Sequence, residues 1–330
     1  METKTIIRKA TNILLPFAIG GVIIWWMYRG FDFSKVSQTL RDGMDWNWML
    51  ISLIFGITAQ VFRGLRWKQT LEPLDEHPRM VDCIHAIFIS YASSLVVPRS
   101  GEVIRCGILK KYDGTSFSKS LGTVLTERVI DSILILLICL IVFLLQLQTF
   151  TNFFAETGTN FVSWLNTFTT TGWIVTICCL ILTIIFVYIL LKRVTGESKI
   201  KQIISDLKAG IFSLKDVGNK GLFTFYTLAI WVSYFLHFYI AFFSFEYTAN
   251  LSLMTALVAF IIGSIAVVVP TPNGMGPWHF AVKTILVLYG VAATDAEMFV
   301  MIVWAVQTAL MPVLGVYSLL CLAQKNEMNK

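Results

Sequence analysis

The stretch that decides the fold is MFVMIVWAVQTALMPVLGVYSLLCL, residues Met298–Leu322, which holds no Asp, Glu, Lys or Arg. About 17–25 such residues span a bilayer as one α-helix. With 56% hydrophobic and 14% charged residues, and a mean hydropathy of +0.72, the chain is predicted to be an all-α, polytopic integral membrane helical bundle. Full spans are expected near residues 11–28, 47–62, 121–149, 172–192, 221–246 and 297–322.

The distribution of Lys and Arg predicts which side each loop faces, because cytoplasmic loops are enriched in both residues. Seven of them lie between residues 192 and 220, whereas residues 150–171 hold none. Basic residues flank 80–97 on both sides, so 80–110 is predicted to be a re-entrant hairpin from the cytoplasm. By parity, 251–290 is an opposite hairpin from the outer side, and both termini are cytoplasmic. Two further full spans, giving eight, are the alternative.

Both hairpins contain a Pro/Gly break, VPRSGE at residues 97–102 and VPTPNGMGP at residues 269–277. The preceding segments, SSLVVP (93–98) and SIAVVVP (264–270), form a weak internal repeat. Opposed repeats with broken helices are typical of secondary transporters, because unwound backbone at membrane depth must line a cavity. We therefore interpret residues 1–330 as a single transmembrane domain. Ordinary interfacial loops are the alternative for the two breaks.

A charged segment precedes the apolar run 132–145. Glu127, Arg128 and Asp131 are predicted to lie in the hydrocarbon, where a charge costs about 2.5–3.5 kcal/mol and is normally paired. Glu127 and Asp131 are four residues apart and therefore share a helix face. Arg128 is three residues before Asp131, which is close enough for their side chains to meet. The alternative is an interfacial cap with side chains that extend to the headgroups.

The first break carries the residue types that bind phosphate. Arg99 and Arg105 offer planar donor forks, and a helix beginning after Gly101 adds its positive end. Glu102 is expected to pair with Arg105 when no ligand is present. This segment is a candidate lipid headgroup site.

Four other positions are ambiguous. Arg63 and Arg66 would add positive charge to the headgroup site, or would simply anchor a helix end at the cytoplasmic surface. His237 and His279 are candidates for proton coupling, although a membrane histidine often serves only as a hydrogen-bond partner. Trp278 is either part of the second break or an interfacial anchor.

Several function classes lack support in the sequence. The six cysteines show no metal-ligand spacing, so neither a metal, a cofactor nor a disulfide framework is expected. There is no phosphate-binding loop, nucleophile elbow, zinc-protease or dinucleotide motif, so an enzyme is not expected. The +6 net charge is interpreted as cytoplasmic anchoring and not as a nucleic-acid surface.

Four motifs occur in order along the chain: RGLRW (63–67), PRSGEVIR (98–105), ERVID (127–131) and PTPNGMG (270–276). Together they resemble the lysylphosphatidylglycerol synthase transmembrane region family, the flippase-like membrane domain of multiple peptide resistance factors. The resemblance implies a bacterial or archaeal inner-membrane protein that moves lipids or lipid-linked intermediates. It implies no lysyl transfer, because a separate soluble domain performs that reaction.

The resemblance also implies which residues matter. The matching positions are Arg99, Gly101, Glu102, Arg105, Glu127, Arg128, Asp131, Pro270, Pro272, Gly274 and Gly276. Two positions depart from the family pattern: Asn273 stands where a second glycine is common, and His279 where a glutamate is common. Substrate or coupling ion is therefore expected to differ here.

The leading hypothesis is a flippase-like transporter whose partners are anionic membrane lipids. A lipid-modifying membrane enzyme, with Glu127, Asp131 or His279 as general acid or base, is one alternative. A noncatalytic partner of a synthase or glycosyltransferase is the other.

Overall fold

The structure, a computed structural model, describes residues 25, 34–146, 205–206, 208–269 and 271–328, and this part of the chain is helical without strands. The α-helices are α2 Ser34–Asp42, α3 Trp46–Leu71, α4 Met80–Val96, α5 Gly101–Asp113, α6 Phe117–Leu145, α11 Lys220–Ile240, α12 Glu246–Ala249, α13 Leu253–Ala266, α14 Pro277–Leu288 and α15 Ala293–Met328. Short 3-10 turns are η1 Glu72–Leu74, η2 Ser213–Asp216, η3 Ala241–Ser244 and η4 Pro272–Gly274. The all-α prediction is confirmed. The predicted spans 11–28 and 172–192, and the loop 150–171, lie outside the described residues.

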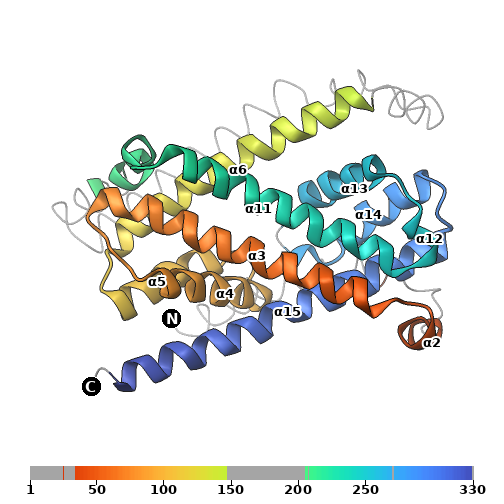
Figure 1. The fold of residues 1–330 in the computed structure, drawn as a ribbon, viewed down its shortest axis with the longest axis horizontal. Helices are drawn as coiled ribbons and strands as arrows, with labels where there is room; N and C mark the ends of the chain where they lie inside the picture. Colours follow the sequence, from red (N-terminus) through yellow and green to blue (C-terminus); the bar gives the residue numbers. More distant parts are fainter. Residues whose placement is uncertain (1–24, 26–33, 147–204, 207, 270, 329–330) are drawn as a thin grey trace, which may run out of the picture.

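Long helices run along the longest axis of the molecule (Figure 1). Within the described ranges, the segments Trp46–Leu74, Lys220–Ser244 and Ala293–Gln324 are long and apolar enough to cross a membrane. Helix α3 packs along α11, and α15 packs along α4. The prediction ended the second span near residue 62, but α3 continues to Leu71. Its last three turns therefore place Arg63 and Arg66 inside a helix.

Two helical hairpins enter this bundle from opposite ends (Figure 1). Helices α4 and α5 pack together and form the first, and α13 and α14 pack together and form the second. These helices have 12 to 17 residues each. At about 1.5 Å per residue each is about 18–26 Å long, short of the roughly 30 Å of a hydrocarbon core. The short lengths therefore favour two opposed hairpins over two additional full spans.

The two hairpin tips touch each other. Arg99 Nη2, on the first tip, donates a hydrogen bond of 2.6 Å to the carbonyl oxygen of Val268 on the second. Arg99 has a φ of 64°, and Asn273 in the second tip a φ of 46°. Left-handed backbone of this kind is uncommon for residues other than glycine, so both tips are sharp turns that the surrounding packing holds in place.

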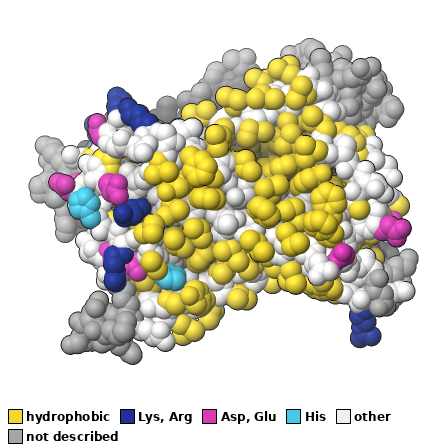
Figure 2. Space-filling view, in the orientation of Figure 1, with side chains coloured by type: hydrophobic (Ala, Val, Ile, Leu, Met, Phe, Trp, Pro, Cys, Tyr) yellow, Lys and Arg dark blue, Asp and Glu magenta, His cyan; other side chains and the backbone are white. Residues whose placement is uncertain are grey.

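The surface has the polarity expected of a protein surrounded by lipid. Hydrophobic side chains cover the middle of the face in Figure 2, and charged side chains gather toward its two ends. Large apolar residues such as Leu136 and Leu140 on α6, and Leu320 on α15, are more than half exposed. A multi-pass membrane protein explains this exposure, because lipid tails solvate apolar side chains that water would not.

Candidate functional site

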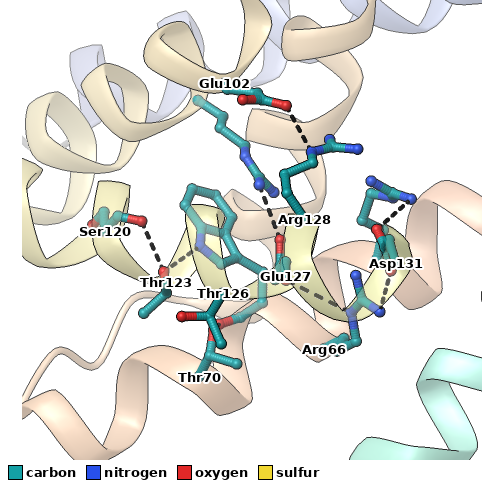
Figure 3. A network of polar contacts seen from close by, with 12 residues as sticks. Arg66, Thr70, Glu102, Ser120, Thr123, Thr126, Glu127, Arg128 and Asp131 are labelled. Carbon is teal, nitrogen blue, oxygen red and sulfur yellow. Dashed lines mark hydrogen bonds and ion pairs between the residues drawn. The ribbon is translucent and has the colours of Figure 1, made fainter. Parts of the chain in front are cut away.

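Five buried charged residues from three helices meet inside the bundle (Figure 3). We call them the buried charge network: Arg63 and Arg66 on α3, Arg105 on α5, and Glu127 and Asp131 on α6. None of the five is more than 6% exposed. Water therefore contributes little to their solvation, and the network must supply its own partners.

Each carboxylate of the network contacts two arginines. Asp131 Oδ1 lies 2.8 Å from Arg66 Nη1, and Asp131 Oδ2 lies 3.3 Å from Arg63 Nη2. Glu127 Oε2 lies 2.9 Å from Arg105 Nη2, and Glu127 Oε1 lies 3.7 Å from Arg66 Nε. Arg66 therefore connects the two carboxylates into one network.

Helical spacing explains why these side chains face each other. Glu127 and Asp131 are four residues apart on α6 and Arg63 and Arg66 three apart on α3, so each pair occupies one helix face. The predicted shared face of Glu127 and Asp131 is confirmed. The interfacial alternatives are wrong for these four residues, because they are buried in contact with one another instead of reaching the membrane surface.

The predicted pairing of the charges is wrong in two respects. Arg128 was expected to pair with Asp131, and Glu102 with Arg105, but Arg128 Nε lies 2.6 Å from Glu102 Oε1. The reason is that neighbouring positions on a helix point about 100° apart, so Glu127 turns inward and Arg128 turns to the edge. Glu102 and Arg128, which we call the outer pair, are 35% and 39% exposed. The outer pair thus joins α5 to α6 at the edge of the buried charge network.

Aromatic side chains line the arginines, and the sequence analysis did not single them out. The Arg105 guanidinium carbon lies 4.6 Å from the ring centroid of Trp67, and Arg63 lies 5.9 and 5.6 Å from Tyr91 and Tyr234. The two tyrosine hydroxyls are hydrogen-bonded to each other at 2.9 Å. Cation–π contacts of this kind gain strength when desolvated. Trp67 belongs to the RGLRW motif, but no local signal marks the two tyrosines.

The other first-break residues have different roles. Gly101 is the first residue of α5, one residue before the predicted start, and a Cβ atom there would lie 2.2 Å from the Ser90 carbonyl oxygen of α4. Glycine is therefore required for the close approach of the two hairpin helices. Arg99 is exposed at the tip and bonds to the second hairpin instead of joining the buried charge network.

The second-break residues are held mainly by α15. The Asn273 side chain donates to Thr308 Oγ1 at 2.6 Å, and Trp304 Nε1 donates to the Asn273 carbonyl at 3.0 Å. Buried His279 accepts at Nδ1 from the backbone N–H of Gly276 at 3.4 Å, and its ring lies 5.0 Å from that of Trp304. His279 thus caps the first turn of α14.

The remaining second-break positions support the turn. Pro272 and Gly274 are buried in η4, and Gly274 and Gly276 have φ values of 70° and 89°. Trp278 is half-buried and packs against Phe238, with ring centroids 6.1 Å apart, so it is part of the packing around the second break. Pro270 lies outside the described residues.

His237 faces α3 and is held by backbone. Its Nδ1 lies 2.7 Å from the Ser52 carbonyl oxygen, and a Cβ atom on Gly56 would meet its ring at 2.8 Å. This is the hydrogen-bonded arrangement of the alternative interpretation. Proton coupling through His237 or His279 stays a prediction.

Comparison with known proteins places the chain in a family. The family model described as the lysylphosphatidylglycerol synthase TM region matches residues 13–315. The chain belongs to this family. A UPF0104 membrane protein of Pyrococcus horikoshii is 21% identical over 146 residues, which cover 42% of this chain and 42% of that protein. No solved structure gives a significant match.

In this member of the lysylphosphatidylglycerol synthase TM region family, the buried charge network carries an excess of positive charge. Its three arginines exceed its two carboxylates by one charge. Arg63 Nε and Nη1, Arg66 Nε and Nη2, Arg105 Nε and Nη1, and the carboxylate oxygens Glu127 Oε1 and Asp131 Oδ2 are buried without a hydrogen-bond partner. Buried polar atoms normally have partners, so both the donors and the acceptors of the network have hydrogen-bonding capacity that its own contacts do not use. Across the described ranges, no group of three or more His, Cys, Asp or Glu side chains is arranged to hold a metal ion.

Proposed function

We propose that this membrane protein is a flippase-like transporter that moves a lipid with an anionic headgroup between the leaflets of a bacterial or archaeal inner membrane. The observation that carries the proposal is the buried charge network, with its excess of one positive charge and its free arginine N–H groups. Charges inside the membrane face a substrate path in many transporters.

The chemistry of the proposed step follows from the contacts. Arginine binds a phosphate through two parallel hydrogen bonds. Glu127 and Asp131 hold the arginines in place while no lipid is bound, which limits the cost of burying them. A phosphate that enters would share these arginines with the carboxylates, while the acyl chains stay in the bilayer beside the exposed apolar side chains.

The proposed orientation follows from the basic residues. One end of the bundle carries the last turn of α3, the base of the first hairpin and the starts of α6 and α11 (Figure 1). The basic residues of this end include Lys68, Arg79, Lys110, Lys111, Lys119 and Lys220. Cytoplasmic segments are enriched in such residues, so we assign this end and both termini to the cytoplasmic side.

Two competing functions make different use of the same residues. In a lipid-modifying enzyme, Glu127, Asp131 or His279 would exchange a proton with the headgroup. The contact of each carboxylate with two arginines disfavours this for Glu127 and Asp131, because both are already engaged in ion pairs. A noncatalytic partner of a synthase or glycosyltransferase would not need the charges at all.

A strain that lacks the protein separates the three functions. Loss of a transporter changes the leaflet distribution of a lipid, measured with a membrane-impermeant amine or headgroup reagent, without removing any lipid species from the total extract. Complementation with the wild-type chain or with Lys110→Gln, an exposed α5 residue, restores the distribution, whereas Arg105→Gln does not. A missing lipid species would support the enzyme, and full rescue by Arg105→Gln would support the scaffold.

A further inference from the structure

We infer that the headgroup recognised by the buried charge network is a phosphodiester with a single negative charge, and not a pyrophosphate or a phosphate monoester. The inference rests on the proposed function for the source of the ligand, a lipid. It depends on the charge balance of the site and on the positions of its free donors.

The charge balance favours a monoanion. Arg63, Arg66 and Arg105 contribute three positive charges, and Glu127 and Asp131 two negative ones. One added negative charge makes the buried site neutral. A second added negative charge would have no buried counterion, and an uncompensated charge in a low-dielectric site is costly. A pyrophosphate carries at least two negative charges, so it is disfavoured here.

The free donors match the same ligand. The buried N–H groups without acceptors belong to guanidiniums that come from two helices, Arg63 and Arg66 on α3 and Arg105 on α5. A phosphodiester has two unesterified oxygens, each of which accepts more than one hydrogen bond from such forks. In this proposal these donors would hold one phosphate group between α3 and α5.

The edge of the site adds no net charge to this balance. The outer pair of Glu102 and Arg128 is neutral as a unit, and it bridges the same two helices, α5 and α6, that Arg105 and Glu127 bridge inside. Because the outer pair is about one third exposed, it marks the side of the buried charge network from which a headgroup would approach. Arg99 is exposed at the tip, where its charge is more strongly screened than a buried one.

Binding to the purified full-length chain in detergent tests the inference separately from transport. The probes are phosphatidylglycerol, phosphatidic acid, a polyprenyl pyrophosphate, uncharged diacylglycerol and water-soluble glycerophosphoglycerol. We expect phosphatidylglycerol to raise the melting temperature and to bind at least about tenfold more tightly than the pyrophosphate lipid, a ratio that corresponds to about 1.4 kcal/mol. Equal or tighter binding of the pyrophosphate or of phosphatidic acid overturns the inference.

Two variants change the charge balance in a controlled way. Glu127→Gln raises the buried charge to two positive units, so the preference should shift toward phosphatidic acid and the pyrophosphate. Arg105→Gln combined with Glu127→Gln restores one positive unit, so the wild-type order of preference should return even if all affinities fall. An unchanged order in Glu127→Gln, or failure of the double variant to regain it, contradicts the charge account. If Glu127→Gln does not fold, the order of probe affinities in the wild type and in the double variant tests the inference.

The soluble probe distinguishes the two sources of a phosphodiester. Stabilisation by phosphatidylglycerol but not by glycerophosphoglycerol supports a lipid ligand, and equal affinity for both overturns the lipid source. Selective binding without movement of any lipid in vesicles would contradict the proposed function and leave the headgroup assignment standing. Movement of lipids without selectivity for a headgroup with one negative charge would support the proposed function and contradict the headgroup assignment.

Discussion

Arg66 on α3 and Asp131 on α6 are joined by a 2.8 Å contact between Nη1 and Oδ1, although 65 residues separate them in the chain. Arg66 also lies 3.7 Å from Glu127 and 3.4 Å from the Thr227 hydroxyl of α11. This one guanidinium therefore links three helices. Its contacts make the buried charge network part of the packing as well as a candidate binding site.

A double-mutant cycle on Arg66 and Asp131 should show strong coupling. Asp131→Asn leaves Arg66 with one charged partner fewer, and breaking a buried ion pair costs about 3–5 kcal/mol. Adding Arg66→Gln removes the stranded charge, so the double variant should be less destabilised than the sum of the single variants. Melting temperature in detergent is the measurement.

Arg128→Gln with Asp131→Asn is the matched control cycle. Arg128 bonds Glu102 and acts on Asp131 only through its charge at longer range, so these two changes should couple much more weakly than Arg66 and Asp131. Additivity for Arg66 with Asp131, or strong coupling for Arg128 with Asp131, would contradict the observed pairing.

Two glycines of α5 should respond in opposite ways to alanine. A Cβ atom at Gly101 would lie 2.2 Å from the Ser90 carbonyl oxygen, whereas Gly107 has no atom within 4 Å of that position. Gly101→Ala should therefore separate α4 from α5 and lower the melting temperature strongly. Gly107→Ala should leave it unchanged or raise it, because alanine favours a helix interior by about 0.8–1.0 kcal/mol. Equal effects of the two changes would show that the hairpin is not closely packed.

The contact between the hairpin tips can be separated from the backbone conformation of Arg99. Arg99→Ala and Arg99→Gly both remove the hydrogen bond to the Val268 carbonyl, and both should alter transport. Glycine accepts the φ of 64° without strain, so Arg99→Gly should be about 1 kcal/mol more stable than Arg99→Ala. Thermal unfolding in detergent measures the difference, and greater stability of the alanine variant would contradict the left-handed conformation.

A carboxyl pair at the base of the first hairpin should make stability depend on pH. Burial, followed by a hydrogen bond to Asp82 and the charge of that residue, raises the pKa of Asp113 to about 7. Arg79 Nε lies 3.2 Å from Asp82 and 3.9 Å from Asp113. Since the folded pKa lies above the unfolded value of about 3.9, the stability from protonated Asp113 is complete below pH 4 and is lost as pH rises through 7.

Asp113→Asn should remove this part of the pH dependence. The wild-type melting temperature should fall between pH 5 and pH 7.5, and the variant's should fall less. Asp216→Asn, which changes an exposed aspartate, is the control and should follow the wild type. Identical curves for wild type and Asp113→Asn would show that Asp113 does not hold a proton in this range.

The parts of the architecture that depend on local sequence features could be predicted from the sequence. Apolar runs marked the long helices, and the Pro/Gly breaks with the Lys and Arg distribution marked the hairpins. The start of α5 near Gly101 follows from the Pro/Gly break, and the shared face of Glu127 and Asp131 follows from four-residue spacing along one helix.

The contacts between helices could not be predicted from local sequence features. Hydropathy falls after residue 62, so the predicted span ended there, but α3 continues to Leu71, and its arginines Arg63 and Arg66 pair with carboxylates of α6. Three-residue spacing predicted partners on the same helix for Glu102 and Arg128. The packing of α5 against α6 instead pairs Glu102 with Arg128. Pairings between distant segments depend on how helices pack, and one sequence does not encode that in local spacing.

Lipid movement in reconstituted vesicles tests the central claim most directly. Vesicles with and without the purified chain carry a tail-labelled phosphatidylglycerol, and an impermeant quencher reports how fast inner-leaflet lipid reaches the outer leaflet. We predict fast movement with the wild-type chain and with Lys110→Gln, and at least about a tenfold slower rate with Arg105→Gln, equivalent to about 1.4 kcal/mol in the barrier. A wild-type rate no faster than that of protein-free vesicles, or an unchanged rate in folded Arg105→Gln, would contradict the account.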